Sequence, residues 1–81
     1  MISSERAMQL AYDLERSLSG MPDGTRLRLA EVREHVDAPL DSRDMKRVLG
    51  VWLRSEACTW TRKSTYIGGK MVQGFTRDSH E

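Results

Sequence analysis

The sequence predicts a single α+β domain with three helices, a short strand and a C-terminal β-hairpin. Three stretches carry apolar residues at helical spacing, and a later stretch rich in Thr, Trp and Tyr turns at two adjacent glycines. The chain has 81 residues, which allows one hydrophobic core but not a cofactor fold with a separate substrate pocket. We expect the domain to span 1–78 and a frayed tail to occupy 79–81.

The first helix is predicted over 4–18, where apolar residues recur every three or four positions on one face. Ser3 or Ser4 is suited to cap its N-terminus, and Gly20 is suited to end it. The buried stripe is expected to consist of Ala7, Leu10, Ala11, Leu14 and Leu18.

A turn, a short strand and a second helix are predicted next. Residues 21–24, Met-Pro-Asp-Gly, are typical of a turn, and leucine then alternates with arginine over 25–29, which predicts a short strand at most. The second helix is predicted over 30–37. It ends before Pro39 because proline disfavours the helical conformation of the residue that precedes it. The apolar face is expected to hold Leu29, Val32 and Val36, with His35 on an exposed face.

The third helix is predicted from Arg43 to about Ser55, with Asp41 or Ser42 as its N-cap. Its buried stripe is expected to consist of Met45, Val48, Leu49, Trp52 and Leu53. A second set at spacings of three or four forms an exposed stripe on the opposite face, made of Arg43, Lys46, Arg47, Gly50 and Arg54.

Two members of this helix leave alternatives open. Gly50 costs a helix about 1 kcal/mol relative to alanine. It fits either a close approach of the backbone to a phosphate or close packing against another helix. Ser42 is suited to be a plain N-cap, and it also leaves the first amides of the helix available to a phosphate.

A β-hairpin is predicted over 59–67 and 70–77, because Gly68-Gly69 supplies the positive φ angles of a two-residue turn. The expected cross-strand pairs are Trp60 with Arg77, Arg62 with Phe75, and Tyr66 with Met71. Trp60 and Phe75 are then expected to reach the core, and Tyr66 and Met71 to lie at the tip. A slip by one residue would exchange the two faces.

The basic residues are concentrated in the C-terminal half, although the net charge is only +1. Residues 43–77 hold eight basic and two acidic residues, whereas residues 1–42 hold five basic and eight acidic ones. Such an uneven distribution favours a negatively charged partner over chance clustering.

The order of elements and three segments resemble the winged helix-turn-helix family, in particular small DNA-binding modules of phages and mobile elements. The segments are 41–50 (DSRDMKRVLG), 60–63 (WTRK) and 67–75 (IGGKMVQGF), and the resemblance covers nearly the whole chain. It implies a three-helix winged helix-turn-helix with a short strand and a C-terminal β-hairpin wing. The wing contacts that it implies are Arg62, Lys63, Ser64, Thr65 and Lys70.

We therefore expect a double-stranded DNA-binding protein, a small transcriptional or replication regulator. Helix 43–55 would lie in the major groove and wing 60–76 on the backbone. One alternative is a winged-helix module that binds a protein, with a homodimer through Met8 and Tyr12 also open. Another is recognition of duplex RNA or DNA by shape. Trp52 and Trp60 fit stacking on single strands less well than core packing.

Other classes of function are not expected. The sequence has no Ser/His/Asp set with supporting motifs, no phosphate-binding glycine loop and no clear carboxylate pair, so we predict no enzyme and no small-molecule substrate. One cysteine and two histidines without ligand spacing predict neither metal nor cofactor. Cys58 is expected to be a small buried apolar residue. Without a signal peptide or a membrane-spanning run, we expect a cytoplasmic protein that binds no membrane.

Overall fold

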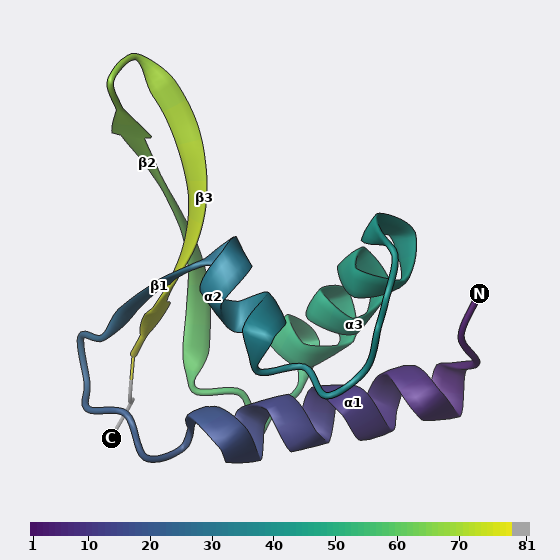
Figure 1. Ribbon diagram of the computed structural model, residues 1–81. Coiled ribbons are helices and arrows are strands. Elements are labelled where there is room, and N and C mark those ends of the chain that lie inside the picture. Colours follow the sequence, from purple (N-terminus) through teal and green to yellow (C-terminus); the bar gives the residue numbers. More distant parts are fainter. Residues whose placement is uncertain (79–81) are drawn as a thin grey trace.

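The computed structural model of the chain describes residues 1–78, and the tail expected at 79–81 lies outside the described residues. The described part has an α+β fold with three helices and a three-stranded antiparallel sheet of strand order β1-β3-β2 (Figure 1). The predicted order of elements is confirmed. The elements are α1 (Ser4–Leu18), β1 (Arg26–Arg28), α2 (Leu29–Glu34), α3 (Ser42–Arg54), β2 (Trp60–Ile67) and β3 (Lys70–Arg77).

The helix α1 forms where the apolar spacing predicts it. The Ser3 hydroxyl accepts the backbone N–H of Arg6 at 3.1 Å, so Ser3 and not Ser4 is the N-cap. All five residues of the predicted apolar stripe are buried. The helix is closed by Ser19, whose backbone N–H donates to the carbonyl of Arg16, one residue before the predicted Gly20.

The second helix begins earlier than the alternating leucines and arginines suggest. Glu31 Oε1 accepts the backbone N–H of Arg28 at 3.1 Å, which makes Arg28 the N-cap and places Leu29 in α2. The strand β1 is therefore only three residues long and not the five that were predicted.

The second helix also ends at Glu34, three residues earlier than predicted. The backbone N–H groups of His35 and Val36 donate to carbonyls three residues back, which tightens the chain out of the α-helical path. Arg33 Nη2 donates to the carbonyl of Leu40 at 2.8 Å and ties α2 to the loop before α3. His35 is half-buried, and its Nδ1 shares a hydrogen bond of 2.9 Å with the Ser17 hydroxyl, so its predicted exposure is wrong.

The helix α3 is capped by Asp41, whose Oδ1 accepts the backbone N–H of Asp44 at 2.8 Å. Ser42 is the first residue of the helix. Four of the five predicted stripe residues are buried, but Leu53 is only half-buried. Leu53 lies at the edge of the buried face of α3, and Asp44 is buried on that face together with the apolar residues.

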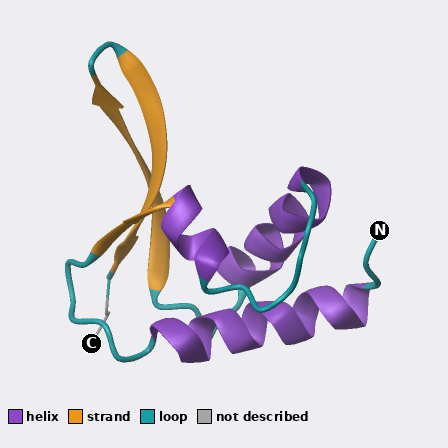
Figure 2. Ribbon diagram, in the orientation of Figure 1, coloured by secondary structure: helices purple, strands orange, loops and turns teal. Residues whose placement is uncertain are grey.

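The hairpin has the predicted register. Trp60 pairs with Arg77, Arg62 with Phe75 and Tyr66 with Met71. The turn is made by Gly68 and Gly69 at φ angles of 59° and 79°, in the left-handed region that glycine tolerates. The strand β1 pairs only with the base of the hairpin, where Arg26–Arg28 lies beside residues 74–76 of β3. The tip of the β2–β3 ribbon therefore projects from the body as two strands (Figure 2).

Three aromatic rings join α3 to the base of the sheet. Trp52 of α3 is 1% exposed, and its ring centroid lies 5.5 Å from that of Phe75 and 6.3 Å from that of Trp60. Both tryptophans are buried, which supports core packing over a stacking platform for single strands.

Glu15 links three elements through one carboxylate, which the sequence did not predict. Its Oε1 accepts the indole N–H of Trp52 at 2.9 Å and the backbone N–H of Thr59 at 3.3 Å. Its Oε2 accepts the Thr59 hydroxyl at 2.7 Å. This carboxylate therefore connects α1, α3 and the segment that enters β2.

Arg77 is a structural residue and does not contribute to an exposed basic surface. Its Nη1 donates to the carbonyl of Ser19 at 2.8 Å and to the carbonyl of Met21. Its backbone N–H and carbonyl pair with Thr25 and Gly24. The end of β3 is thus fastened to the turn that follows α1.

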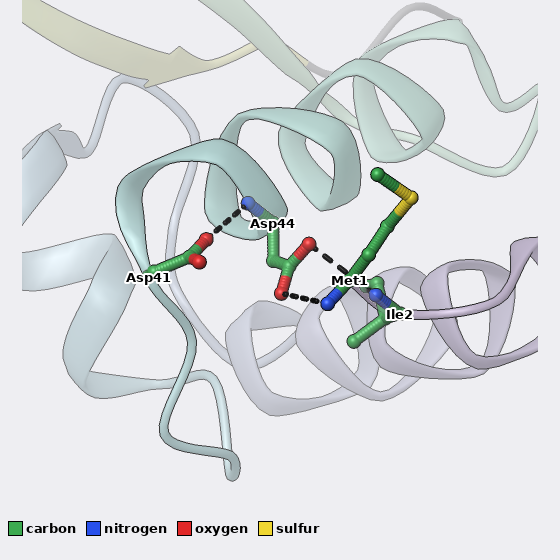
Figure 3. Close-up of polar contacts among 4 residues, drawn as sticks. All are labelled: Met1, Ile2, Asp41 and Asp44. Atoms are coloured by element: carbon green, nitrogen blue, oxygen red, sulfur yellow. Dashed lines mark hydrogen bonds and ion pairs between the residues drawn. The ribbon is translucent and has the colours of Figure 1, made fainter.

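Asp44 holds the N-terminal segment against α3 (Figure 3). Its side chain is buried, and its Oδ1 accepts the backbone N–H of Ile2 at 3.3 Å. Its Oδ2 lies 3.8 Å from the amino group of Met1. Asp44 is therefore turned away from the basic stripe of the same helix.

Over residues 1–78, no helix combines the length and the apolar character that a membrane crossing requires.

We expect Glu15→Gln to destabilise the fold by about 1–3 kcal/mol, because a half-buried carboxylate that accepts three hydrogen bonds loses its charge and one acceptor oxygen. The measurement is urea unfolding followed by tryptophan fluorescence. The matched control is Glu56→Gln, an exposed residue, which should change stability by less than about 0.5 kcal/mol. Equal unfolding midpoints for the two variants would contradict the linking role of Glu15.

Candidate nucleic-acid interface

The exposed face of α3 carries the predicted basic stripe. Arg43, Lys46, Arg47 and Arg54 are all exposed, and the core residues of α3 lie on the other side of the helix. The side chains of Arg43 and Lys46 form no hydrogen bond or salt bridge with residues 1–78. Their charged ends are therefore available to a partner in solvent.

A hollow of about 170 Å³ lies between α2, α3 and the β2–β3 hairpin. Three cationic side chains from the three elements line it: Arg33 of α2, Lys46 of α3 and Arg62 of β2. Ser42 and Gln73 contribute polar groups from α3 and β3. A drug-sized ligand needs a pocket of about 300 Å³ or more, so the hollow suits the surface of a larger anionic partner better than an enclosed small molecule.

Arg62 is held in this hollow by the hairpin register. It lies opposite Phe75, and its guanidinium carbon is 6.0 Å from the centre of the Phe75 ring. Because neighbouring side chains of a strand point to opposite faces, Lys63 points away from the hollow. Lys63 and Thr65 instead line a separate hollow on the other face of the sheet, with Arg26 and Arg28. Lys70 is exposed beside the turn at the tip, opposite Ile67.

The predicted α3 stripe is also divided. Arg47 Nη2 donates to the Ser4 hydroxyl of α1 at 2.8 Å, and Arg54 Nε donates to the Gly50 carbonyl at 3.0 Å. Both arginines line a groove between α1 and α3 and not the hollow beside the hairpin. Arg43 lies between these two edges of the helix.

Gly50 has no neighbouring helix against it. A Cβ atom at this position would meet only the guanidinium of Arg54, at 3.4 Å, so the alternative of close helix packing is wrong. The amides at the start of α3 lie beside the Asp41 carboxylate, which accepts the Asp44 N–H. This negative charge disfavours a phosphate at the helix N-terminus, and Ser42 therefore offers its hydroxyl and not an amide cradle.

The groove between α1 and α3 is mainly apolar and has a volume of about 630 Å³. Met8 and Tyr12 lie along it and are 61% and 59% exposed, and Val51 contributes from α3. These are the α1 residues that the sequence offered as a surface for self-association.

Two residues of the hairpin-side hollow were missed by sequence reasoning. Arg33 was counted in the acidic N-terminal half, although α2 comes directly before the predicted basic helix. Gln73 faces Ser64 in the register that the sequence predicted, so alternation along β3 could have placed it beside Arg62. Within residues 1–78, no three His, Cys, Asp or Glu side chains are grouped so that they could hold a metal ion.

Comparison with protein-family models, with curated proteins and with solved structures finds no significant match to this chain.

Cys58 lies half-buried at the junction of α3 and β2. Burial raises the pKa of its thiol above the ordinary value of 9.0, and the negative charge of Glu15 raises this pKa further. A hydrogen bond from the backbone N–H of Trp60 to Sγ, at 3.4 Å, acts in the opposite direction. Cys58 is therefore mostly a neutral thiol at physiological pH.

We expect iodoacetamide to alkylate Cys58 more slowly in the folded protein than in urea, because only the thiolate reacts and its population falls as the pKa rises. The midpoint of the rate against pH should lie above 9.0 when the protein is folded. Glu15→Gln should move this midpoint down, since it removes a charge that raises the pKa. An unchanged midpoint in the variant would show that Glu15 does not act on the thiol.

Proposed function

We propose that this domain is a winged helix-turn-helix module that binds double-stranded DNA. In this proposal α3 enters the major groove, and the β2–β3 hairpin is the wing that lies on the adjacent backbone. The observation that carries the proposal is the convergence of Arg33, Lys46 and Arg62, from three different elements, on one hollow. A helix face, its preceding helix and the hairpin thus offer positive charge to the same side of the molecule.

The dimensions of α3 agree with this role. Its 13 residues correspond to about 20 Å of helix, and the major groove is about 12 Å wide. Arg43 and Lys46 extend from its exposed face, where long cationic side chains reach base edges and flanking phosphates. Their lack of partners within residues 1–78 means that binding breaks no internal ion pair at these positions.

The role assigned to the module is control of transcription or replication at a recognised DNA site, without catalysis. Phosphate contacts from Arg62 and Arg33 fix the position of the domain on the duplex, and the α3 side chains read the base edges. Trp52 is buried in the core and cannot contact DNA. In this proposal, recognition of the base sequence therefore depends on the polar and charged side chains of α3.

A second candidate is a protein-interaction module that uses the groove between α1 and α3. The observation that favours it is the exposed apolar pair Met8 and Tyr12 beside Val51. Self-association is the form of this candidate that the chain can test by itself. The measurement is sedimentation equilibrium. A concentration-dependent dimer that Tyr12→Glu dissociates would support self-association, and a monomer at every concentration would exclude self-association.

We expect the double variant Arg43→Gln/Lys46→Gln to weaken duplex binding at least about tenfold, because each lost base contact costs about 1–3 kcal/mol. The slope of log affinity against log salt should also become shallower, by about 0.9 for each phosphate contact removed. The measurement is fluorescence anisotropy with a labelled duplex selected from a random-sequence pool, at two salt concentrations.

The matched control for this experiment is Arg6→Gln/Arg16→Gln, which removes the same charge from the exposed side of α1. This control should change the affinity less than about threefold, through long-range electrostatics alone. The proposal is wrong if the wild-type protein binds no duplex at low salt, or if the α3 variant and the α1 control weaken binding equally.

A further inference from the structure

The face of the sheet that points away from the core carries four cationic side chains, which we call the outer basic face. The strand register places them on one side of the three strands, because Arg26 and Arg28 lie beside Thr76 and Gly74, and Lys63 lies on the other side of Gly74. Lys70 lies on the same face nearer the tip. The opposite face carries Leu27, Trp60 and Phe75 into the core, so the two faces have separate roles.

The central row of the outer basic face has no side chain on β3, because a Cβ atom at Gly74 would lie 3.2 Å from the Lys63 carbonyl oxygen and 3.3 Å from the Leu27 carbonyl oxygen. Arg28, Gly74 and Lys63 form one row across β1, β3 and β2. Neighbouring strands are about 4.8 Å apart, so the two cationic residues start about 10 Å from each other with only a glycine between them. A hollow of about 220 Å³ lies above this row, and its walls include Thr65 and Thr76. Both long side chains can close over one anionic group in this space.

The positive charge of this face is only partly offset by the rest of the described protein. Arg26, Arg28, Lys63 and Lys70 are exposed, and none has a side-chain hydrogen bond or salt bridge to the described residues. Of the residues that line the hollow, Glu31 is acidic, and Arg26, Arg28 and Lys63 are basic. The basic residues therefore outnumber the acidic one, and this excess of positive charge favours a polyanionic partner.

Protection of strand edges does not account for the arrangement by itself. Lysine on an edge strand prevents pairing with other chains from either face of the sheet. Here the two basic residues of β1 and the lysines of β2 and β3 all share one face. This segregation of positive charge to one face fits contact with a polyanion better than protection against aggregation.

We propose that the outer basic face binds the sugar–phosphate backbone of a second DNA segment, so that one molecule bridges two duplexes. This inference rests on the proposed function, in which α3 and the inner side of the hairpin hold the first duplex. A phosphate above Gly74 lies between Arg28 and Lys63, where the guanidinium can donate two parallel hydrogen bonds. The threonine hydroxyls supply further donors to the backbone.

A separate segment is required because the two surfaces look in opposite directions across the sheet. A duplex seated on α3 would have to bend around β1 to reach Arg26 and Arg28. DNA is stiff over about 150 base pairs, so a short duplex does not make this turn without a sharp kink. The second site is therefore filled by another duplex, or by a distant part of a long one.

The test is a bridging assay in which one short duplex is immobilised and a second, differently labelled duplex is captured from solution by the protein. The variant is Arg26→Gln/Arg28→Gln, which changes two exposed side chains and leaves the Arg28 backbone cap in place. The matched control is Arg6→Gln/Arg16→Gln, with the same change in net charge. Circular dichroism and thermal unfolding establish that both variants fold.

We expect the wild-type protein and the α1 control to capture the second duplex, and the outer-face variant to lose at least about fivefold of this capture. Binding of the outer-face variant to a single duplex should weaken less than about threefold. If the wild-type protein binds a single duplex but captures no second one, or if the outer-face variant captures it as well as the control, the bridging inference is wrong and the proposed function stands.

The complementary variant is Arg43→Gln/Lys46→Gln. It should lose both single-duplex binding and capture, because the first duplex is held at α3. If this variant instead keeps full binding while Arg26→Gln/Arg28→Gln abolishes it, the outer basic face is the main DNA site and the proposed role of α3 is wrong. The two failures therefore give different results.

Discussion

The packing of Trp52 determines how the candidate interface is arranged. This side chain belongs to α3, contacts the rings of Trp60 and Phe75 at the base of the hairpin, and donates its indole N–H to Glu15 of α1. Four elements therefore meet at one buried residue. Because these contacts hold α3 against the hairpin, they also fix the position of Lys46 relative to Arg62. Both residues line the hollow between the two elements.

Because side chains alternate along each strand, the hairpin presents basic residues on two opposite faces. With Phe75 and Trp60 held in the core, Arg62 must share their face and Lys63 must take the other. A charge count along the hairpin treats these two neighbours as one basic patch. The structure assigns one to the α3 side and the other to the outer face, so that the same hairpin presents positive charge in two directions.

Local patterns in the sequence were sufficient to predict the elements and the hairpin register. The apolar stripes of 4–18 and 43–55 follow helical periodicity, and two adjacent glycines can make only a few turn types, so the pairing of 60–77 follows from the turn. The second helix differs from the prediction because its start depends on a carboxylate that reaches back to the Arg28 amide. Its end depends on His35 and Val36, whose backbone N–H groups donate to carbonyls three residues back. Neither contact leaves a periodic signal in the sequence.

Long-range polar contacts account for the remaining errors in the site. Arg77 and Asp44 both contribute to the charge count of residues 43–77, yet Arg77 binds carbonyls after α1 and Asp44 holds the N-terminal segment. One positive and one negative residue thus leave the surface of the C-terminal half together, and its predicted excess of positive charge is unchanged. Arg26 and Arg28 were counted with the acidic half, although β1 brings them beside β3. A count of charges along the chain therefore underestimates the positive charge that the fold gathers on the sheet.

The tip of the hairpin shows where the core ceases to determine the structure. Beyond Gly74 the sheet has two strands, and Tyr66 and Met71 are 71% and 58% exposed on the face that lower down enters the core. An isolated two-stranded ribbon is marginally stable in water, so turn chemistry and cross-strand contacts must hold this segment. These exposed aromatic and thioether groups gain most when a partner covers them. On the proposed function that partner is the deoxyribose surface beside the phosphates, which makes the tip the part of the wing most stabilised by binding.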